Sequence, residues 1–186
     1  MNEVQPLQDT TDIQRISEFL LTHYSQTFSD YWLFGCCVAL RVSDLLAIKF
    51  SDIRKRKGIH YLIVKEAKTG KSKEIELNIV AAEIFTRRAK QKGDVFLFRS
   101  NWKYHTETKP LSRSAFSKAV QDAAPSLELV IGTHSMRKTL GYHTYKRTND
   151  LALVQKILGH SSSAHTLRYI GINAEKINQQ FAANYF

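Results

Sequence analysis

One stretch of the sequence departs from the helical spacing that the rest of the chain follows, and this departure limits the possible folds. In "GIHYLIVKEAKTGKSKEIELNI", residues 58–79, a β-rich run and an alternating run flank a polar turn that contains glycine. Alternation with a period of two predicts strands, and two strands joined by a short polar turn predict a hairpin. The tip of this hairpin carries Lys68, Lys71 and Lys73.

The apolar residues on either side of this stretch recur at helical spacing. In residues 10–24, Ile13, Ile16 and Leu20 share one face behind Thr and Asp residues that favour a helix start. A second helix is predicted from Ser29 through "SDYWLFGCCVAL". Further elements are predicted as a short helix capped by Ser43, helices at 79–91, 112–123, 135–147, 150–158 and 173–183, and a candidate strand at 94–98. The expected fold class is α+β, mainly helical, with one small antiparallel β-sheet.

Length and charge indicate one domain with an anionic partner. A chain of 186 residues with 43% apolar content can bury one core, so we expect a flexible N-terminus at residues 1–10 and a single domain at residues 11–186. Lys and Arg outnumber Asp and Glu by 27 to 17, which favours a polyanion or an anionic membrane surface as partner. The basic residues are spread over several segments, which indicates a footprint built from several elements; the alternative is a solvated basic face.

The cysteines and the apolar runs bear on the cellular compartment. Cys36 and Cys37 are adjacent within an apolar run, so they cannot form an ordinary structural disulfide, and they lack the spacing of metal ligands. No charged and then apolar leader opens the sequence, and the run that Arg41 interrupts is too short to span a membrane. We therefore expect buried thiols, a cytoplasmic location and no membrane partner.

Two arginines occur at positions where a charge needs an explanation. Arg41 ends an apolar helix and must either pair with a carboxylate, such as that of Asp44, or project into a site. His134 and Arg137 are three residues apart at the start of a predicted helix, where they share a face and where main-chain amides attract an anion. Taken singly, an ion pair and a capping histidine would account for them.

The stretch "LGHSSSAHTLRYIG", residues 158–171, predicts the end of one helix and the capped start of another. Glycine suits the left-handed position after a helix, and serine caps the next helix. His160 would then lie at the mouth of the turn, nine residues before Tyr169. Taken alone, this pair would be a surface histidine and a half-buried tyrosine.

Together these residues fit a particular chemistry. Two arginines, two histidines, a hairpin lysine and a tyrosine, with no Asp/Glu cluster to hold a metal, suit phosphoryl transfer in which protein cations replace magnesium. Guanidinium groups can grip the nonbridging oxygens of the transition state. A phenol has an unperturbed pKa of about 10, so its attack needs a cationic field and a proton acceptor. A lysine on the hairpin could protonate the leaving alkoxide.

Four segments carry a resemblance to a known family. They are "CVALRVSDLLAIKFSDI", "VKEAKTGKSKEIEL", "THSMRKTLGYHTY" and "LGHSSSAHTLRYIGI", and they resemble the signature regions of the tyrosine recombinases, the phage integrase family, in the same order. The resemblance implies a tyrosine-recombinase-like catalytic domain that works as a site-specific DNA recombinase or integrase without a metal or a cofactor. It also implies double-stranded DNA as partner, self-association as a tetramer on DNA, and accessory proteins that bend DNA.

The resemblance also implies a role for each site residue. Arg41 and Arg137 would clamp the scissile phosphate, Asp44 would buttress Arg41, and Lys68 would be the general acid. The remaining roles concern His134 and His160, which would assist proton transfer and hydrogen-bond the phosphate, and Tyr169, which would form a 3′-phosphotyrosine and release a 5′-hydroxyl.

The sequence departs from the family pattern in two places. Family members often have His after the second arginine, where this chain has Lys138, a position outside the expected catalytic set. Integrases usually carry an N-terminal core-binding domain, and only a short segment precedes the helix that leads to Arg41, so no separate core-binding domain is expected. Two alternative functions stay open: a strand nicking and closing enzyme like the type IB topoisomerases, and a noncatalytic DNA-binding accessory module.

Overall fold

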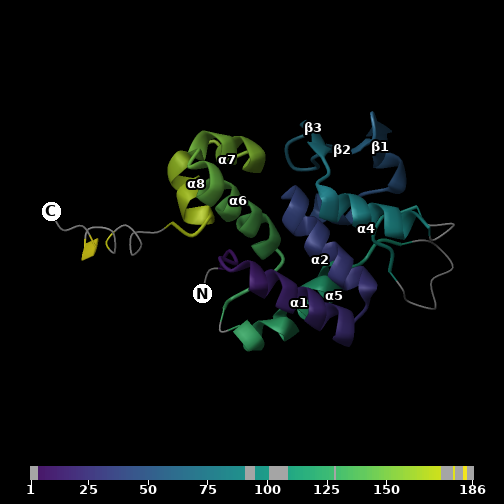
Figure 1. The fold of residues 1–186 in the computed structure, drawn as a ribbon, viewed down its shortest axis with the longest axis horizontal. Helices are drawn as coiled ribbons and strands as arrows, with labels where there is room; N and C mark the ends of the chain where they lie inside the picture. Colours follow the sequence, from purple (N-terminus) through teal and green to yellow (C-terminus); the bar gives the residue numbers. More distant parts are fainter. Residues whose placement is uncertain are drawn as a thin grey trace.

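The computed structural model describes residues 4–90, 95–100, 109–127, 129–172, 178, 182 and 183. Within these residues helices predominate, and a small sheet lies on one side of the helical body (Figure 1). The helices are α1 (Thr10–His23), α2 (Gln26–Val38), α3 (Val42–Leu46), α4 (Ile79–Ala89), α5 (Arg113–Ala123), α6 (Ser135–Thr148), α7 (Leu151–Leu158) and α8 (Ser163–Tyr169), with 3-10 turns η1 (Phe50–Asp52) and η2 (Ala124–Leu127). The mainly helical α+β prediction is confirmed.

The sheet consists of β1 (Ile53–Arg56), β2 (Ile59–Lys65) and β3 (Ser72–Glu76), antiparallel and in sequence order. The predicted hairpin is formed by β2 and β3. Strand β1 was not predicted, because in "IRKR" only Ile53 is buried and three exposed basic residues hide the alternation of a strand. The candidate strand at 94–98 is reduced, in its described part, to the single bridge between Phe96 and Lys49.

Helix α2 lies in the middle of the helical body and fills the larger core. Tyr31, Trp32 and Phe34 are fully buried. The ring of Tyr31 lies edge-on to Phe116 of α5 at 4.3 Å and to Phe98 at 5.1 Å between centroids. A helix enclosed by neighbours is apolar on most of its surface, which explains the long apolar run in this part of the sequence. This helix begins at Gln26, earlier than the predicted Ser29.

Two glycines let the helices near the predicted site approach closely. A Cβ atom at Gly35 of α2 would lie 2.3 Å from the Sδ atom of Met136 in α6. A Cβ atom at Gly141 of α6 would lie 2.9 Å from Ile170, which follows α8. The helix ends that carry the predicted site residues are thereby drawn together.

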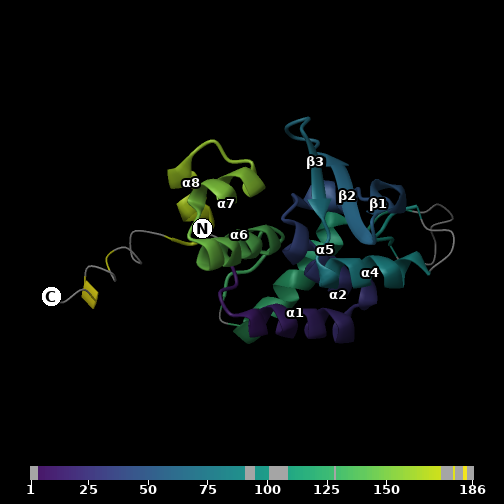
Figure 2. The same ribbon diagram turned by 45° about the horizontal axis from the view of Figure 1, so that its top comes forward.

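A second, smaller core joins α6, α7 and α8, which lie beside the sheet and across from the hairpin (Figure 2). Its buried members are Ala39, Val154, Leu158 and Ile170. Gly159 ends α7 with φ +61°, and the side chain of Ser162 accepts a hydrogen bond from the main-chain N–H of His165 at the start of α8. The predicted helix end followed by a capped restart is confirmed.

Residues near the N-terminus differ from the expected flexible segment. Leu7 is fully buried, and its N–H donates to Oγ1 of Thr139 at 2.9 Å. The N–H of Gln5 donates to the carbonyl of Val130 at 2.9 Å. These hydrogen bonds attach the N-terminal segment to α6 and to Val130, which precedes α6. The helix predicted at 173–183 lies almost entirely outside the described residues, and no described helix is long and apolar enough to cross a membrane.

Candidate active site

Five of the six residues expected in the catalytic set lie together. Arg41 is the N-cap of α3, His134 is the N-cap of α6, and Arg137 lies in the first turn of α6. His160 lies in the turn after α7, and Tyr169 is the last residue of α8. The charges of both arginines act on the imidazole of His160 and on the phenol of Tyr169. The fold therefore assembles one cationic site from segments that are far apart in sequence.

Arg137 is held by main-chain oxygens. It is 3% exposed, and its two terminal nitrogens donate to the carbonyl groups of Ala39, after α2, and Leu158, at the end of α7. Its charge acts on the phenol of Tyr169 and favours the deprotonated form of that group. Because the main-chain carbonyl groups do not move, they hold the guanidinium group in one orientation. Its remaining N–H groups then point in one direction, which suits an oxyanion site.

Glu66, rather than Asp44, is the ion-pair partner of Arg41. Nη1 of Arg41 lies 3.0 Å from Oε1 of Glu66. The side chain of Asp44 instead accepts a hydrogen bond from the main-chain N–H of Ala67 at 2.9 Å, at the base of the hairpin turn. The expected contact rested on the closeness of the two residues in sequence, but Arg41 is the N-cap of α3 with extended backbone (φ −67°, ψ 149°), and its side chain pairs with the hairpin carboxylate. Asp44 thus contacts the hairpin and not the arginine.

The carboxylate of Glu66 joins the hairpin to the arginine. Glu66 is 1% exposed, its Oε1 atom also lies 2.9 Å from Nζ of Lys73, and its Oε2 atom accepts from the hydroxyl of Thr69 at 2.8 Å. Burial alone would raise the pKa of Glu66, but the hydrogen bonds from Lys73 and Thr69 and the charges of Lys73 and Arg41 lower this pKa to about 2. Sequence reasoning missed this residue because nothing in "KEAK" distinguishes a buried carboxylate from an exposed one.

The hairpin lysines differ in position. Lys73 is half-buried, and its Nζ atom also donates to the carbonyl of Ile157 near the end of α7 at 3.0 Å. Lys68 lies exposed in the turn between β2 and β3, and within the described part of the chain no contact joins its side chain to the site residues. The structure therefore places Lys73, and not the predicted Lys68, beside the arginines.

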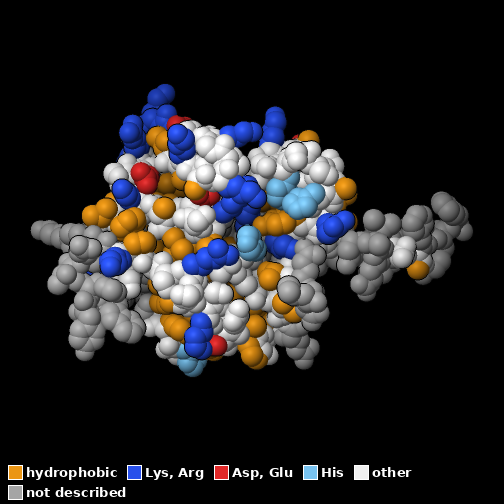
Figure 3. Space-filling view, turned by 180° about the vertical axis from the view of Figure 1, so that it is seen from behind, with side chains coloured by type: hydrophobic (Ala, Val, Ile, Leu, Met, Phe, Trp, Pro, Cys, Tyr) orange, Lys and Arg blue, Asp and Glu red, His pale blue; other side chains and the backbone are white. Residues whose placement is uncertain are grey.

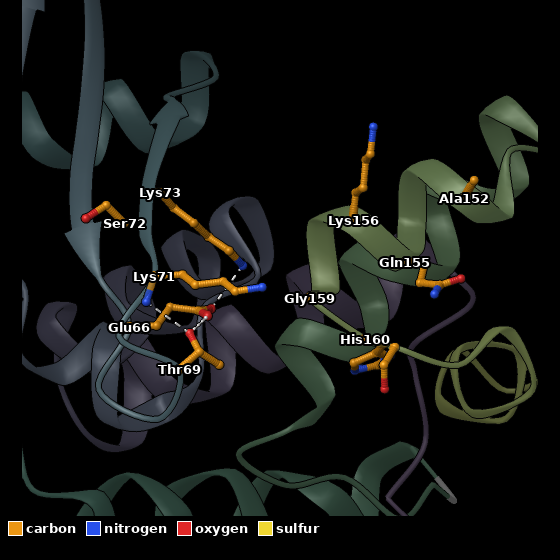
Figure 4. A pocket seen from close by; sticks show the side chains of 11 residues that line it. Glu66, Thr69, Lys71, Ser72, Lys73, Ala152, Gln155, Lys156, Gly159 and His160 are labelled. Carbon is orange, nitrogen blue, oxygen red and sulfur yellow. Dashed lines mark hydrogen bonds and ion pairs between the residues drawn. The ribbon is translucent and has the colours of Figure 1, made fainter.

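A cavity of about 570 Å³ separates the hairpin from α7 and the turn that follows it (Figure 4). Glu66, Thr69 and Lys73 line one side, and Gln155 and His160 line the other. In Figure 4 the side chain of Lys73 points toward Glu66 on the hairpin side of this space. The cavity therefore lies between Lys73 of the hairpin and the His160 edge of the site.

The imidazole of His160 is held in one tautomer. Its Nδ1 atom lies 3.3 Å from Oγ1 of Thr166, and that hydroxyl donates its proton to the carbonyl of Ser162 at 2.8 Å. Because the hydroxyl proton is already used, Nδ1 must carry the donated hydrogen, which leaves Nε2 as a proton acceptor. Burial, followed by the charges of His165 and Arg137, lowers the pKa of His160 to about 4. The imidazole is therefore neutral at physiological pH.

Tyr169 is half-buried beside this imidazole. The two rings lie edge to face with 4.8 Å between their centroids. Burial raises the pKa of the Tyr169 phenol, while the charge and hydrogen bond of Arg137 and the charge of Arg41 act in the opposite direction. The resting phenol is neutral, so its use as a nucleophile requires a nearby proton acceptor.

Two further residues of α6 border the site. His134 is exposed, and partial desolvation, followed by the charges of Arg113 and Arg137, lowers its pKa. Lys138 is buried, with Nζ 5.0 Å from the centroid of the Tyr169 ring. Sequence reasoning placed Lys138 outside the catalytic set. Its spacing from His134 on a helix was the available signal, because residues four apart share a face.

Comparison with known proteins identifies the family. The model of the phage integrase family matches residues 9–176. The chain belongs to the phage integrase family. It is a tyrosine-type recombinase, an enzyme of DNA breakage and rejoining. The probable integrase/recombinase YoeC of Bacillus subtilis (strain 168) is 37% identical over 179 residues, which cover 94% of this chain and 93% of YoeC.

Solved structures of other integrases and recombinases share the fold. The crystal structure of XerA recombinase matches with a TM-score of 0.71 at 18% identity, over 98% of this integrase and 68% of the XerA chain. The crystal structure of a lambda integrase tetramer bound to a Holliday junction matches with a TM-score of 0.71 at 20% identity, over 92% of this integrase and 50% of the lambda chain. The expected tyrosine-recombinase catalytic fold is confirmed.

Basic side chains gather on one face of this integrase. In Figure 3, several Lys and Arg side chains stand in the upper part of the molecule over the sheet, others lie in the centre, and His side chains lie near α7 and α8. The exposed basic residues of the sheet and its turns are Arg54, Lys55, Arg56, Lys57, Lys65, Lys68 and Lys71. This distribution over several elements is the footprint expected for a DNA-binding surface.

Proposed function

We propose that Tyr169 is the nucleophile that attacks the scissile phosphate of double-stranded DNA. The Oη–phosphorus bond forms, the bond from phosphorus to the 5′-oxygen breaks, and the products are a 3′-phosphotyrosine and a 5′-hydroxyl. Attack by that hydroxyl on the phosphotyrosine reverses the step and rejoins a strand. The observation that carries this proposal is the edge-to-face contact of the Tyr169 ring with the neutral imidazole of His160, at 4.8 Å between centroids, where the charge of the buried Arg137 also acts on the phenol.

The phenolic proton needs an acceptor, and His160 supports this role best. Its Nδ1–H is committed to Thr166, so Nε2 is the basic atom, and its ring lies beside that of Tyr169. A neutral imidazole can accept a proton at the pH where the enzyme works. His134 is the candidate for a hydrogen bond to a phosphate oxygen, because it is exposed at the N-terminus of α6.

Arg41 and Arg137 are proposed to stabilise the charge that develops on the nonbridging oxygens. Arg137 is oriented by the carbonyls of Ala39 and Leu158, and Arg41 is oriented by Glu66 while its side chain keeps 20% of its surface exposed. Donors held in place before the reaction lower the barrier more than mobile donors do.

The general acid for the 5′-oxygen is proposed to come from the hairpin. The family resemblance favours Lys68, whose exposed position means that it reaches the 5′-oxygen only when DNA lies against the turn. Lys73 already lies in the cavity, but Glu66 and the Ile157 carbonyl hold its ammonium group. A substrate whose leaving group needs no proton distinguishes the two lysines.

The proposed partners follow from the relatives. Lambda integrase is a tetramer on a Holliday junction in the structure to which this chain is similar. We propose that this recombinase also forms a tetramer on double-stranded DNA, with DNA-bending proteins as candidate accessory factors, in the cytoplasm. No metal or cofactor is assigned to the reaction.

The polarity of the cleaved ends tests the proposed chemistry. The purified protein would be incubated with a pool of nicked duplexes that have a randomised core, and the reaction stopped with denaturant. We expect protein attached to 3′ ends only, and released ends that polynucleotide kinase can label without prior dephosphorylation. Protein on 5′ ends would contradict the proposal. Relaxation of supercoiled plasmid by the monomer would favour the topoisomerase alternative.

A further inference from the structure

Lys138 contacts the proposed nucleophile from a second direction. It follows Arg137 on α6, and the two neighbouring residues act on Tyr169 differently: the charge of Arg137 acts on the phenol, and the ammonium group of Lys138 lies 5.0 Å from the ring centroid. The edge of the His160 ring contacts the same tyrosine. The position of the ring is therefore defined on more than one side.

Burial of Lys138 requires a reason. It is 5% exposed, and lysine is rarely buried to that extent, because an ammonium group loses its hydration. A cation over an aromatic face is attracted by the negative potential of the ring. The contact with Tyr169 gives the buried charge a favourable partner in the part of the site where the nucleophile is held.

The charge also has a chemical consequence. When a phenol loses its proton, part of the negative charge spreads into the ring, so a cation near the ring stabilises the phenolate more than the phenol. The other charged or titratable groups that face Tyr169 come from α6, the N-cap of α3, the turn after α7, and α8: Arg137, Arg41, His160 and His165. Among these neighbours His160 is neutral and the two arginines are cations, and in the described contacts Lys138 is the cation on the ring face.

We propose that Lys138 is a positioning residue for the nucleophile, which holds the ring of Tyr169 and favours its deprotonated form. The proposal rests on the proposed function of Tyr169. It gives a role to a position at which this chain departs from the histidine that family members often carry.

Titration of Tyr169 tests the proposal without DNA. The protein would be labelled with 3-fluorotyrosine, and the ¹⁹F resonance of Tyr169 identified by its loss in Tyr169→Phe. Removal of a cation about 5 Å away should raise the titration midpoint of Tyr169 in Lys138→Met by about 0.5 pH unit or more. Lys138→Arg should restore most of the wild-type midpoint. The control Lys118→Met removes an exposed lysine of α5 and should leave the midpoint unchanged.

Cleavage kinetics provide the second readout. With the same nicked duplexes at saturating concentration, Lys138→Met should cleave about tenfold more slowly at neutral pH, and the deficit should shrink as the pH rises. DNA affinity should change little, and Lys138→Arg should cleave faster than Lys138→Met.

Two results would overturn the inference: an unchanged Tyr169 midpoint in a folded Lys138→Met protein, or a cleavage deficit that is equal at every pH. Failure of the proposed function would look different, because Tyr169→Phe would then still form the covalent adduct at full yield, whatever the titration of Tyr169 in the Lys138 variants.

Discussion

At the scale of single residues, the two arginines of the site differ in what holds them. Arg137, in α6, donates hydrogen bonds to the main-chain carbonyls of Ala39 after α2 and Leu158 in α7, and it is 3% exposed. It therefore contributes to the packing of these three helices as well as to the site. Arg41 is held by one carboxylate, and its side chain keeps 20% of its surface exposed. The same substitution should therefore have different effects at the two positions.

Replacement of either arginine should impair cleavage much more than DNA binding. Loss of one preorganised donor group should raise the cleavage barrier by about 3–4 kcal/mol in Arg41→Ala and in Arg137→Lys. DNA affinity should fall far less, because many other basic residues share the contacts with DNA. Arg137→Ala should in addition lower the free energy of unfolding by about 1–3 kcal/mol, since buried carbonyls lose their donors. Single-turnover cleavage at saturating DNA and urea denaturation measure the two effects. If the cleavage defects vanish once DNA is saturating, the arginines only bind DNA.

Glu66 should make stability depend on pH in acid. Its pKa falls from 4.5 to about 2 on folding, so its contribution is fully present above pH 4.5 and is lost as the pH falls from 4.5 through about 2. That shift corresponds to about 3 kcal/mol. The difference in the free energy of unfolding between wild type and Glu66→Gln should therefore be larger at pH 7 than at pH 3. Glu83→Gln, an exposed residue of α4, is the control. An equal difference at both pH values would remove Glu66 from the ion cluster.

At the scale of elements, the local sequence pattern of the hairpin predicted its strands but not its tertiary contacts. Alternating residues and a glycine turn predicted β2 and β3, and Gly159 with the following serines predicted the turn that carries His160. The partner of Arg41 was not predictable in this way. Glu66 reaches it because the turn after β2 lies beside α3, where the main-chain N–H of Ala67 donates to Asp44, and such a tertiary contact leaves no period in the sequence.

The lysine that acts as general acid can be identified by the leaving group. Sulfur in place of the 5′-bridging oxygen leaves without protonation, so loss of the general acid should be rescued on this substrate. We expect Lys68→Ala to cleave ordinary DNA poorly and the 5′-thio substrate at nearly the wild-type rate. Lys73→Ala should stay slow on both, because it loses the bridge from Glu66 to the Ile157 carbonyl. Rescue of Lys73→Ala or Lys71→Ala alone would move the role to that lysine, and no rescue in any variant would remove the general acid from the hairpin.

At the scale of the whole molecule, the site depends on how the α6–α8 group sits against the hairpin and α2. Sequence patterns predicted most of the individual helices and four signature segments, and the resemblance predicted that these segments meet. The packing that brings them together is set by close approaches such as Gly35 to Met136 and Gly141 to Ile170, which no local rule predicts.

This packing predicts which protomer supplies the nucleophile. Tyr169 lies beside the Arg137 of its own chain, so cleavage should use both residues from one chain. A mixture of Arg137→Lys and Tyr169→Phe proteins should then cleave no better than either variant alone. Recovery of activity in the mixture would mean that the tyrosine is donated to a neighbouring protomer.

The most direct measurement maps the covalent bond between protein and DNA. Adducts formed on the nicked duplex pool would be isolated in denaturant, digested with nuclease and trypsin, and analysed by mass spectrometry. We expect a nucleotide remnant on Tyr169, within the tryptic peptide 169–176, that is absent from Tyr169→Phe and retained in the control Tyr145→Phe. A remnant on another residue, or an adduct of undiminished yield in Tyr169→Phe, would contradict the account.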